Sequence, residues 1–504
     1  MKLLRAGVSV IVLAGSTLAP CQNTFIVQFD SVQAGRDASG RSVMEIDSGL
    51  LVFAWQRSSD GTELMRSAVY KLGPDGSFLD RVEIGTGDPA SSGFGNFDPV
   101  ARSTDGDFVS AITHTYGYEY AIELSRFNGV GELMESVPVL FSPGTDSTVL
   151  VARQTRATVD GGHVLCGASD APGATAEALL VKVSADGTVQ WQHTYGAGGQ
   201  TFDAISVAPY LDGGYVLAGY RLPANLTNLG WVIRTDSEGN ELWRRFFGND
   251  GGGWGAVRIT ADSCILTFSS YGESGWPFGW RQHLLTKWNA EGQIVWQTRS
   301  NYYSNVTAYD LEVLPDQSII GVGTFSTVIG LTKYSAAGDS LWCRFLRVFD
   351  NLGGHSAYDV ELASDGGFLL TGEASQAAGD PHPGLQTIFV IKTDSFGCVV
   401  PGCQNVGVEE YVIDLQEHLH ISPNPASDLV NVLLELPEGG VVHGQAQVQL
   451  VDASGSMVLE EKVQQNFNQL RTTLDVSALP SGTYYLHLRD GKRWLAGGKV
   501  VVQR

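Results

Sequence analysis

The sequence predicts an all-β fold, and three observations support this prediction. Glycine accounts for 61 of 504 residues, and 10% of residues are aromatic while only 17% are charged, which suits short strands joined by many turns. A phrase typical of a tight turn followed by a strand, DGGYVLAGY at 212–220, has looser or closer copies that begin at 47, 104, 160, 261, 315 and 365. After each copy comes a basic residue that stands five positions before a glycine, in the pairs Lys71/Gly76, Arg126/Gly131, Lys182/Gly187, Arg234/Gly239, Lys287/Gly292, Lys333/Gly338 and Lys392/Gly397.

One repeat unit predicts four strands. In the fourth unit they are FDAISVAPYL (202–211), YVLAGY (215–220), GWVIRT (230–235) and NELWRRFF (240–247), with glycine turns between the first and second and between the third and fourth. The unit recurs about every 46–59 residues, the length of a β-propeller blade. A four-stranded sheet cannot bury two faces alone, so seven copies predict a seven-bladed ring of four-stranded blades.

The seventh unit predicts how the ring closes. After Gly397 it continues as CVVPGC, which has a proline and no tryptophan, so its fourth strand is missing. The segment TFIVQFD at 24–30 belongs to no unit, and we expect it to supply that strand. This order places the glycine turns on one rim and the variable loops, such as 221–230, 271–282 and 376–386, on the other. Variable loops on a rigid scaffold are the usual place for binding.

Two sets of side chains are candidate ligand-binding residues. The loop GWPFGW supplies an aromatic platform for a sugar or peptide, with residues Trp276, Phe278 and Trp280; the alternative is that these rings pack on a neighbouring blade. Four units open with an aromatic residue followed by an aspartate, and these carboxylates could ring one mouth of the central channel: Asp98, Asp203, Asp310 and Asp359. A ring of carboxylates could hold a cation, but we favour aspartates that cap backbone N–H groups.

The phrase DSEGNELW at 236–243 is similar to the tryptophan-docking repeat of quinoprotein propellers, a resemblance that implies a quinone cofactor and bound Ca²⁺. The chain lacks that family's extra threonine-glycine and adjacent cysteine pair, so we interpret its tryptophans as packing between blades. ADGTVQW at 185–191 resembles the Asp-box of sialidases with shifted spacing. Neither G-x-S-x-G nor HExxH occurs, and we expect no cofactor and no metal ligand set.

The formal net charge of −22 repels phosphate backbones and argues against nucleic acid as a partner. Residues 1–21 predict a signal peptide cleaved after Cys21; a lipoprotein cysteine at this position is the alternative, which Pro20 fits poorly. No other segment is apolar enough to cross a membrane. Export permits disulfides, and Cys398 and Cys403 flank a Pro-Gly turn that suits a local one.

From 419 onward the repeats give way to SPNPASDLVNV, LVDASGSMV and LDVSALPSGTYYLHL, followed by KVVVQR. Alternating apolar positions and glycine turns predict a small β-sandwich. The three motifs, in this order, resemble the type A C-terminal sorting domain of the type IX secretion system. The family's recognition and folding positions fall on Pro423, Asn424, Pro425, Gly455, Leu479, Gly482 and Tyr484. The resemblance implies passage through the periplasm and across the outer membrane, with release or surface attachment.

The expected organisation is a signal peptide (1–21), a seven-bladed propeller (22–404), a linker (405–418) and the sorting domain (419–504). Its expected partners are the type IX secretion machinery and a surface glycan or protein. We favour a secreted or cell-surface propeller that binds without catalysis. The alternatives are a secreted carbohydrate-active hydrolase or lyase that uses carboxylates on the variable-loop rim, and a structural surface-layer component.

Overall fold

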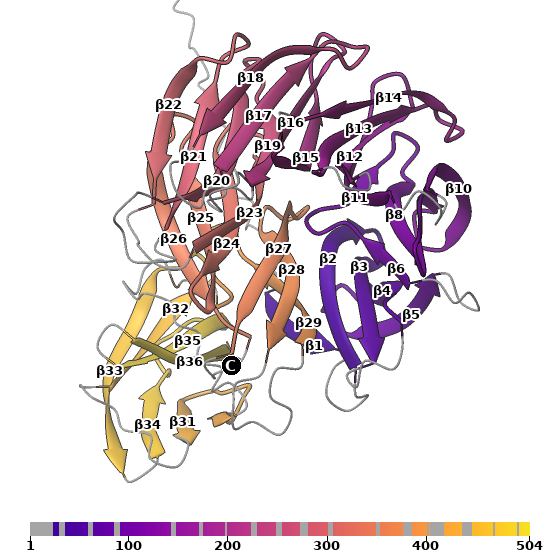
Figure 1. The fold of residues 1–504 in the computed structure, drawn as a ribbon. Coiled ribbons are helices and arrows are strands. Elements are labelled where there is room, and N and C mark those ends of the chain that lie inside the picture. The colour runs from indigo at the N-terminus through magenta and orange to yellow at the C-terminus, as the bar shows by residue number, and fades with distance from the viewer. Residues whose placement is uncertain are drawn as a thin grey trace, which may run out of the picture.

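The computed structural model is an all-β ring of sheets with a second β-domain beside it (Figure 1). It describes residues 24–29, 36–58, 64–84, 91–142, 148–170, 175–196, 199–222, 229–247, 255–272, 281–300, 306–348, 353–375, 386–400, 403, 418–435, 446–466, 469–490 and 493–504. The predicted signal peptide (1–21) and nearly all of the predicted linker (405–418) lie outside these ranges, so those domain boundaries stay predictions.

Seven antiparallel sheets follow one another along the chain as blades, which confirms the predicted fold class. Blade 1 contains β2 (Arg36–Ile46), β3 (Gly49–Ser58), β4 (Arg66–Leu72) and β5 (Phe78–Ile84). Blade 2 contains β6 (Ser91–Phe94), β7 (Val100–Arg102), β8 (Phe108–Tyr116), β9 (Glu119–Phe127) and β10 (Leu133–Ser142). Blade 3 contains β11 (Val149–Ala157), β12 (His163–Asp170), β13 (Glu177–Val183) and β14 (Val189–Tyr195). Blade 4 contains β15 (Thr201–Pro209), β16 (Tyr215–Leu222), β17 (Leu229–Thr235) and β18 (Glu241–Phe247).

The ring continues through three more blades. Blade 5 contains β19 (Gly255–Ile259), β20 (Ile265–Tyr271), β21 (Gln282–Trp288) and β22 (Ile294–Arg299). Blade 6 contains β23 (Val306–Val313), β24 (Ile319–Phe325), β25 (Val328–Tyr334) and β26 (Ser340–Leu346). Blade 7 contains β27 (His355–Leu362), β28 (Phe368–Ser375), β29 (Gln386–Thr393) and, from the other end of the chain, β1 (Phe25–Phe29).

The N-terminal strand closes the ring as the sequence predicts. β1 pairs antiparallel with β29, with Phe25 opposite Lys392 and Phe29 opposite Ile388. Its alternate side chains pack against two different cores: Ile26 against the core of blades 6 and 7, and Val27 against that of blades 7 and 1. One short strand therefore fills the outer position of blade 7 and pairs the edge of β29, which would otherwise be open at the seam.

The two recurring phrases of the sequence meet in blades 3, 4, 5 and 7. The aspartate of the first glycine turn forms an ion pair with the basic residue of the third strand in Asp160–Lys182, Asp212–Arg234, Asp262–Lys287 and Asp365–Lys392. Each aspartate is more exposed than its cationic partner. Hydrogen bonds from Thr158 and Lys182 lower the pKa of Asp160 to about 2. The phrase therefore ties the turn to the strand that runs beside it.

The second recurring glycine joins neighbouring blades. A Cβ on Gly292 of blade 5 would lie 2.9 Å from the ring of Trp243, which belongs to blade 4, and Gly292 has a φ of 73°. Trp243 Nε1 also donates to Ala290 O of the same turn, at 2.8 Å. The same contact joins Gly239 to Trp191, Gly338 to Trp296 and Gly397 to Trp342. The tryptophans therefore pack between blades, as expected.

The first strand of blade 2 departs from the repeat. It is split into β6 and β7, which both pair with β8, and Asp98 between them has a φ of 39°. Pro99 follows directly and has no N–H for a strand ladder. The interruption lets this segment leave the sheet and reach the centre of the ring, where its side chains meet those of blades 6 and 7.

The C-terminal domain is the predicted β-sandwich. Its strands are β30 (Leu419–Ser422), β31 (Leu429–Glu435), β32 (Ala446–Asp452), β33 (Met457–Asn466), β34 (Gln469–Asp475), β35 (Gly482–Asp490) and β36 (Arg493–Val502). β33 pairs with β32 along most of its length and with β34 at its end, so it links two layers around one apolar core. Val451 and Tyr485 also join the core of blades 6 and 7 beside Val399 and Val400, so the domain sits against this side of the ring (Figure 1).

We predict that Gly292→Ala destabilises the protein more than Gly106→Ala. Both glycines have a positive φ, which costs a side chain roughly 1 kcal/mol, but a Cβ on Gly106 meets no atom within 4 Å. The overlap with Trp243 should raise the cost at Gly292 to about 3 kcal/mol. Urea unfolding measures the free-energy cost of each variant. The extra cost of Gly292→Ala over Gly106→Ala should disappear in a Trp243→Ala background. Equal costs of the two variants in the wild-type background would show that the turn does not hold the neighbouring blade.

Candidate functional site

The innermost strands of the blades position the side chains of the central channel. In blades 1, 3, 4, 6 and 7 this strand carries a one-residue β-bulge, whose extra residues are Arg41, Arg153, Ile205, Tyr309 and Tyr358. A bulge redirects the side chains around it and increases the local twist. The residue after each bulge is equivalent from blade to blade, being Ser42, Gln154, Ser206, Asp310 and Asp359.

An aromatic cluster occupies the channel on the side of the variable loops. The rings of Phe97, Tyr309 and Tyr358 lie with centroids 4.9–5.4 Å apart, and Ile205 packs with them. These residues come from blades 2, 6, 7 and 4, so they meet across the ring. The innermost strands run from the variable-loop rim toward the glycine turns. The residues that follow the aromatic cluster in these strands therefore lie on its turn side.

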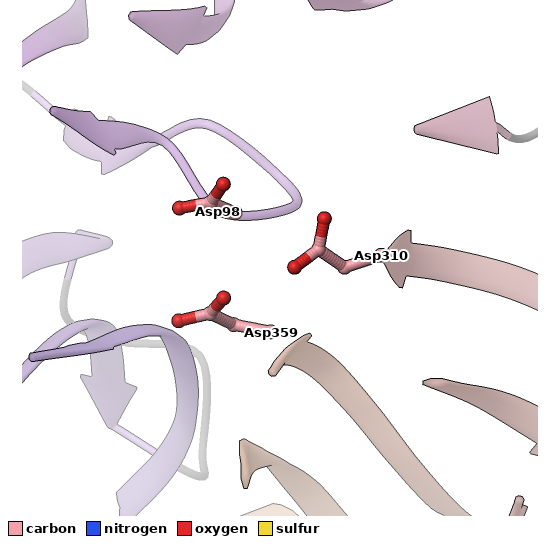
Figure 2. A group of neighbouring side chains, drawn as sticks. All are labelled: Asp98, Asp310 and Asp359. Atoms are coloured by element: carbon pink, nitrogen blue, oxygen red, sulfur yellow. The ribbon is translucent and has the colours of Figure 1, made fainter. Parts of the chain in front are cut away.

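Directly beyond the aromatic cluster, three carboxylates converge (Figure 2). One oxygen from each of Asp98, Asp310 and Asp359 lies within 4.8 Å of the other two. All three side chains are buried, with at most 6% of each residue exposed. We call these three residues the hub carboxylates.

Two guanidinium groups bind the hub carboxylates. Arg258 Nη2, from blade 5, donates to Asp98 Oδ2 and to Asp310 Oδ1, each at 2.9 Å. Arg156 of blade 3 forms an ion pair with the same Asp98 oxygen. Arg258 Nε also lies 3.4 Å from Glu312 Oε2. Blades 2, 3, 5 and 6 are thereby connected through charges at the centre of the ring.

Backbone N–H groups of the next blade complete this arrangement. Asp359 Oδ2 accepts from Val43 N at 2.7 Å, across the seam of the ring, and Asp310 Oδ2 accepts from Val360 N at 3.3 Å. The equivalent side chains of blades 3 and 4 also accept hydrogen bonds from the backbone of the next blade. Gln154 Oε1 accepts from Val207 N, and Ser206 Oγ accepts from Val257 N. In blades 3, 4, 6 and 7 the side chain after the bulge therefore holds the blade to its neighbour.

Burial dominates the electrostatics of the hub. It raises the pKa of Asp310 to about 6 and that of Asp359 well above its usual value, with the neighbouring carboxylates adding to the shift of Asp359. Burial, assisted by Asp98, raises the pKa of Glu361 to about 8. Burial acts to lower the pKa of Arg258, but Asp310 and Asp98 outweigh it and raise that pKa. The hub thus concentrates more acid than the two arginines neutralise.

Sequence reasoning missed the partners of the hub carboxylates. Glu312 and Glu361 stand two residues after Asp310 and Asp359, in the matching phrases YDLEV and YDVEL, and this repeated D-x-E spacing was the available signal. Two residues further along a strand return to the same face, so each unit sends two carboxylates toward the channel. Arg258 carries no such signal, because its partner Asp98 lies 160 positions away.

The fourth aspartate of the predicted set lies elsewhere. Asp203 precedes the bulge of its blade by two residues, so it is not equivalent to Asp310, and the structure pairs it with Arg153 at 2.7 Å and with Tyr220 at 3.3 Å. The predicted aromatic platform, Trp276, Phe278 and Trp280, lies outside the described residues. The spacing to the following turn aspartate was the available signal, since Asp203 stands nine residues before Asp212 whereas Asp310 stands six before Asp316.

The remaining predicted residues have structural contacts. A disulfide joins Cys398 to Cys403, with Cα atoms 5.7 Å apart. In the sandwich, Asn424 Nδ2 donates to Lys499 O at 2.7 Å and its Oδ1 accepts from Val501 N at 2.8 Å. The other sorting positions lie in the same domain: Pro423 and Pro425 flank Asn424, Gly455 has a φ of 80° in a turn, Leu479 packs against the core, Gly482 begins β35, and Tyr484 Oη donates to Pro480 O.

A broad groove opens on the turn rim over blades 7, 1 and 2. Its volume is about 960 Å³. Its charged lining is mainly acidic, with Glu45, Asp47, Asp105, Asp107 and Asp365 against Arg102 and Lys392. Asp365 and Lys392 are already paired with one another, and Arg102 donates to Glu45 O. No sequence motif indicated this groove.

Comparison with known proteins identifies the C-terminal domain. Residues 420–503 match the secretion system C-terminal sorting domain family, so this part of the chain is the sorting domain that the three motifs predict. Its presence indicates export to the cell surface or secretion through the type IX system. No curated protein matches the chain. Among the described residues there is no helix long and apolar enough to span a membrane.

The ring resembles several solved structures at low identity. They include a PL25 polysaccharide lyase named as an ulvan lyase, with 10% identity and a TM-score of 0.48 over 73% of this chain and 96% of that one. The phage phi92 endosialidase has 9% identity and a TM-score of 0.41 over 74% and 69%. A mutant of the Synechocystis apocarotenoid oxygenase has 12% identity and a TM-score of 0.40 over 65% and 94%.

We predict that Arg258→Met destabilises the ring by about 3–5 kcal/mol, because it leaves buried carboxylates without their counter-charge. The matched control is Arg57→Met, since Arg57 forms a single ion pair with Asp37 and its side chain is 51% exposed; it should cost less than about 1 kcal/mol. Chemical denaturation at neutral pH compares the two. Similar costs would mean that Arg258 does not hold the hub together.

Proposed function

We propose that the protein is a secreted or surface-exposed propeller that binds a glycan or a protein without catalysing a reaction. The sorting domain at 420–503 is the observation that supports the location in this proposal, because it indicates export to the cell surface or secretion. The hub supports a structural role for the channel charges: the hub carboxylates are buried, contact arginines or backbone N–H groups, and lie behind the aromatic cluster. Binding is then left to the rims.

The variable-loop rim is the surface that we propose for the ligand. Its loops at 221–230, 271–282 and 376–386 differ in length and sequence while the strands beside them repeat, and such loops on a rigid scaffold commonly carry binding residues. The loop at 271–282 offers Trp276 and Trp280, and exposed indole rings stack on sugar faces and anchor protein interfaces. The acidic groove on the turn rim is the competing surface.

An array experiment tests this proposal. The purified protein is screened on glycan and peptide arrays, and the double variant Trp276→Ala/Trp280→Ala should lose at least tenfold in affinity for any ligand found, as about 1.4 kcal/mol of lost binding energy implies. Asp47→Asn in the groove is the control and should bind like the wild type. Loss of binding in the control alone would move the site to the turn rim. A protein that binds nothing on either array would favour the structural surface-layer role.

A hydrolase or lyase is the second candidate, and one observation favours it. Glu361, whose pKa burial raises to about 8, lies near Glu312, whose side chain is 36% exposed; two neighbouring carboxyl groups, one of them with a raised pKa, are the groups that glycoside hydrolysis uses. These two residues lie toward the turn side of the channel, whereas the sequence placed catalytic carboxylates on the variable-loop rim. Degradation of any polysaccharide in a panel, abolished by Glu361→Gln, would establish catalysis.

We predict that the sorting domain alone determines delivery. In a host with a type IX system, a chain truncated after residue 404 should remain inside the outer membrane, in the periplasm, whereas the full chain reaches the surface or the medium. The matched control fuses residues 405–504 to an unrelated periplasmic protein, which should then also be exported. Cell fractionation and surface proteolysis measure the location. Export of the truncated chain, or retention of the fusion, would contradict the prediction.

A further inference from the structure

We propose that Asp98, Asp310 and Asp359 bind a divalent cation of the Ca²⁺ type at the centre of the ring. The first observation is an unsatisfied atom: Asp359 Oδ1 is buried and has no hydrogen-bond partner among the described residues, in a residue that is 1% exposed. A buried carboxylate oxygen without a partner is costly. Figure 2 shows the carboxylate groups of Asp98, Asp310 and Asp359 around one common space.

The second observation is the balance of charge. Besides the hub carboxylates, Glu312 and Glu361 lie close enough to act on the same groups. These five acidic groups face Arg156 and Arg258 as the basic groups that contact the hub carboxylates. Arg102 also acts on Glu361, so five formal negative charges face three positive ones and leave an excess of two negative charges. A divalent cation would offset this excess at the place where it is largest.

The geometry also fits an ion. Ca²⁺ binds oxygens at about 2.3–2.6 Å, so two oxygens that share one ion lie at most about 5 Å apart. One oxygen of each hub carboxylate satisfies this limit, because the three lie within 4.8 Å of one another. Arg258 and the N–H groups of Val43 and Val360 already fix the carboxylates in place, and a carboxylate oxygen that accepts one hydrogen bond retains a second lone pair.

The chemistry of the ligands selects the class of ion. Three carboxylates with no nitrogen or sulfur donor among them suit the hard cations Ca²⁺, Mg²⁺ and Mn²⁺ rather than zinc or copper. Water can complete the coordination from the turn side, where Glu312 is partly exposed, whereas the aromatic cluster covers the other side. Such an ion would connect blades 2, 6 and 7, which stand on both sides of the seam between blades 7 and 1.

A chelation experiment on the full chain tests the proposal. The protein is stripped with EDTA and titrated with CaCl₂, and we expect one ion per chain by calorimetry and a rise in Tm. Terbium(III) luminescence gives a direct readout, since Tyr309 and Tyr358 lie next to the hub carboxylates and can sensitise a bound lanthanide. Asp359→Asn should weaken Ca²⁺ binding at least tenfold and reduce the sensitised emission.

The matched control is Asp203→Asn, which changes another buried aspartate of an innermost strand that is paired with Arg153; its Ca²⁺ affinity should equal that of the wild type. Should Asp359→Asn fail to fold, Asp310→Asn replaces it with the same expectation. The competing explanation is a proton on Asp359. In that case the wild type shows neither a Ca²⁺-dependent rise in Tm nor terbium emission, and Asp359→Asn is at least as stable as the wild type, which overturns the proposal.

Discussion

The structure depends on one repeated contact, in which a bulky side chain on the outer strand of one blade rests on a glycine turn of the next. The turn needs a positive φ, and the space where a Cβ would stand is filled by a tryptophan ring at Gly239, Gly292, Gly338 and Gly397. Glycine meets both needs at once. At the seam, Phe25 of the N-terminal strand takes the place of the tryptophan over Gly76. The closing strand therefore reproduces the same joint that the rest of the ring uses.

The centre of the ring is built on a different principle. Toward the outside the blades pack through apolar surface, whereas at the hub side chains such as Asp359, Asp310, Gln154 and Ser206 bind the backbone of the next blade. Buried ion pairs are poor contributors to stability, because desolvation consumes much of the attraction. Polar contacts have strict geometry, however, so they can fix how each blade is rotated against its neighbour. We infer that apolar packing supplies most of the stability, and that the hub sets the register.

The sequence predicted what is local and repetitive, and it failed where contacts join distant blades. The number of blades could be predicted from the repeat period and the two glycine turns. The closing strand could be predicted from the segment at 24–30, which belongs to no repeat unit. The aspartates after the aromatic residues were found, but Asp203 was wrongly grouped with Asp310, because it stands three residues earlier in its strand than the equivalent position, Ser206. Arg258 was not predicted, since nothing in the chain near it indicates a partner in blade 2. Propeller hubs combine residues from units that are remote in sequence, and only the closed ring brings them together.

This division of roles limits where function can reside. A channel that is capped by Phe97, Tyr309 and Tyr358 and occupied by paired charges leaves little room for a ligand from the variable-loop side. The sorting domain packs through Val451 and Tyr485 against the side of blades 6 and 7, next to the disulfide loop. The strands and the hub carboxylates hold the ring together, and the sorting domain serves export. We therefore propose that specificity is carried by surface loops, which can vary without disturbing the ring or the sorting domain. Fold alone does not identify the ligand.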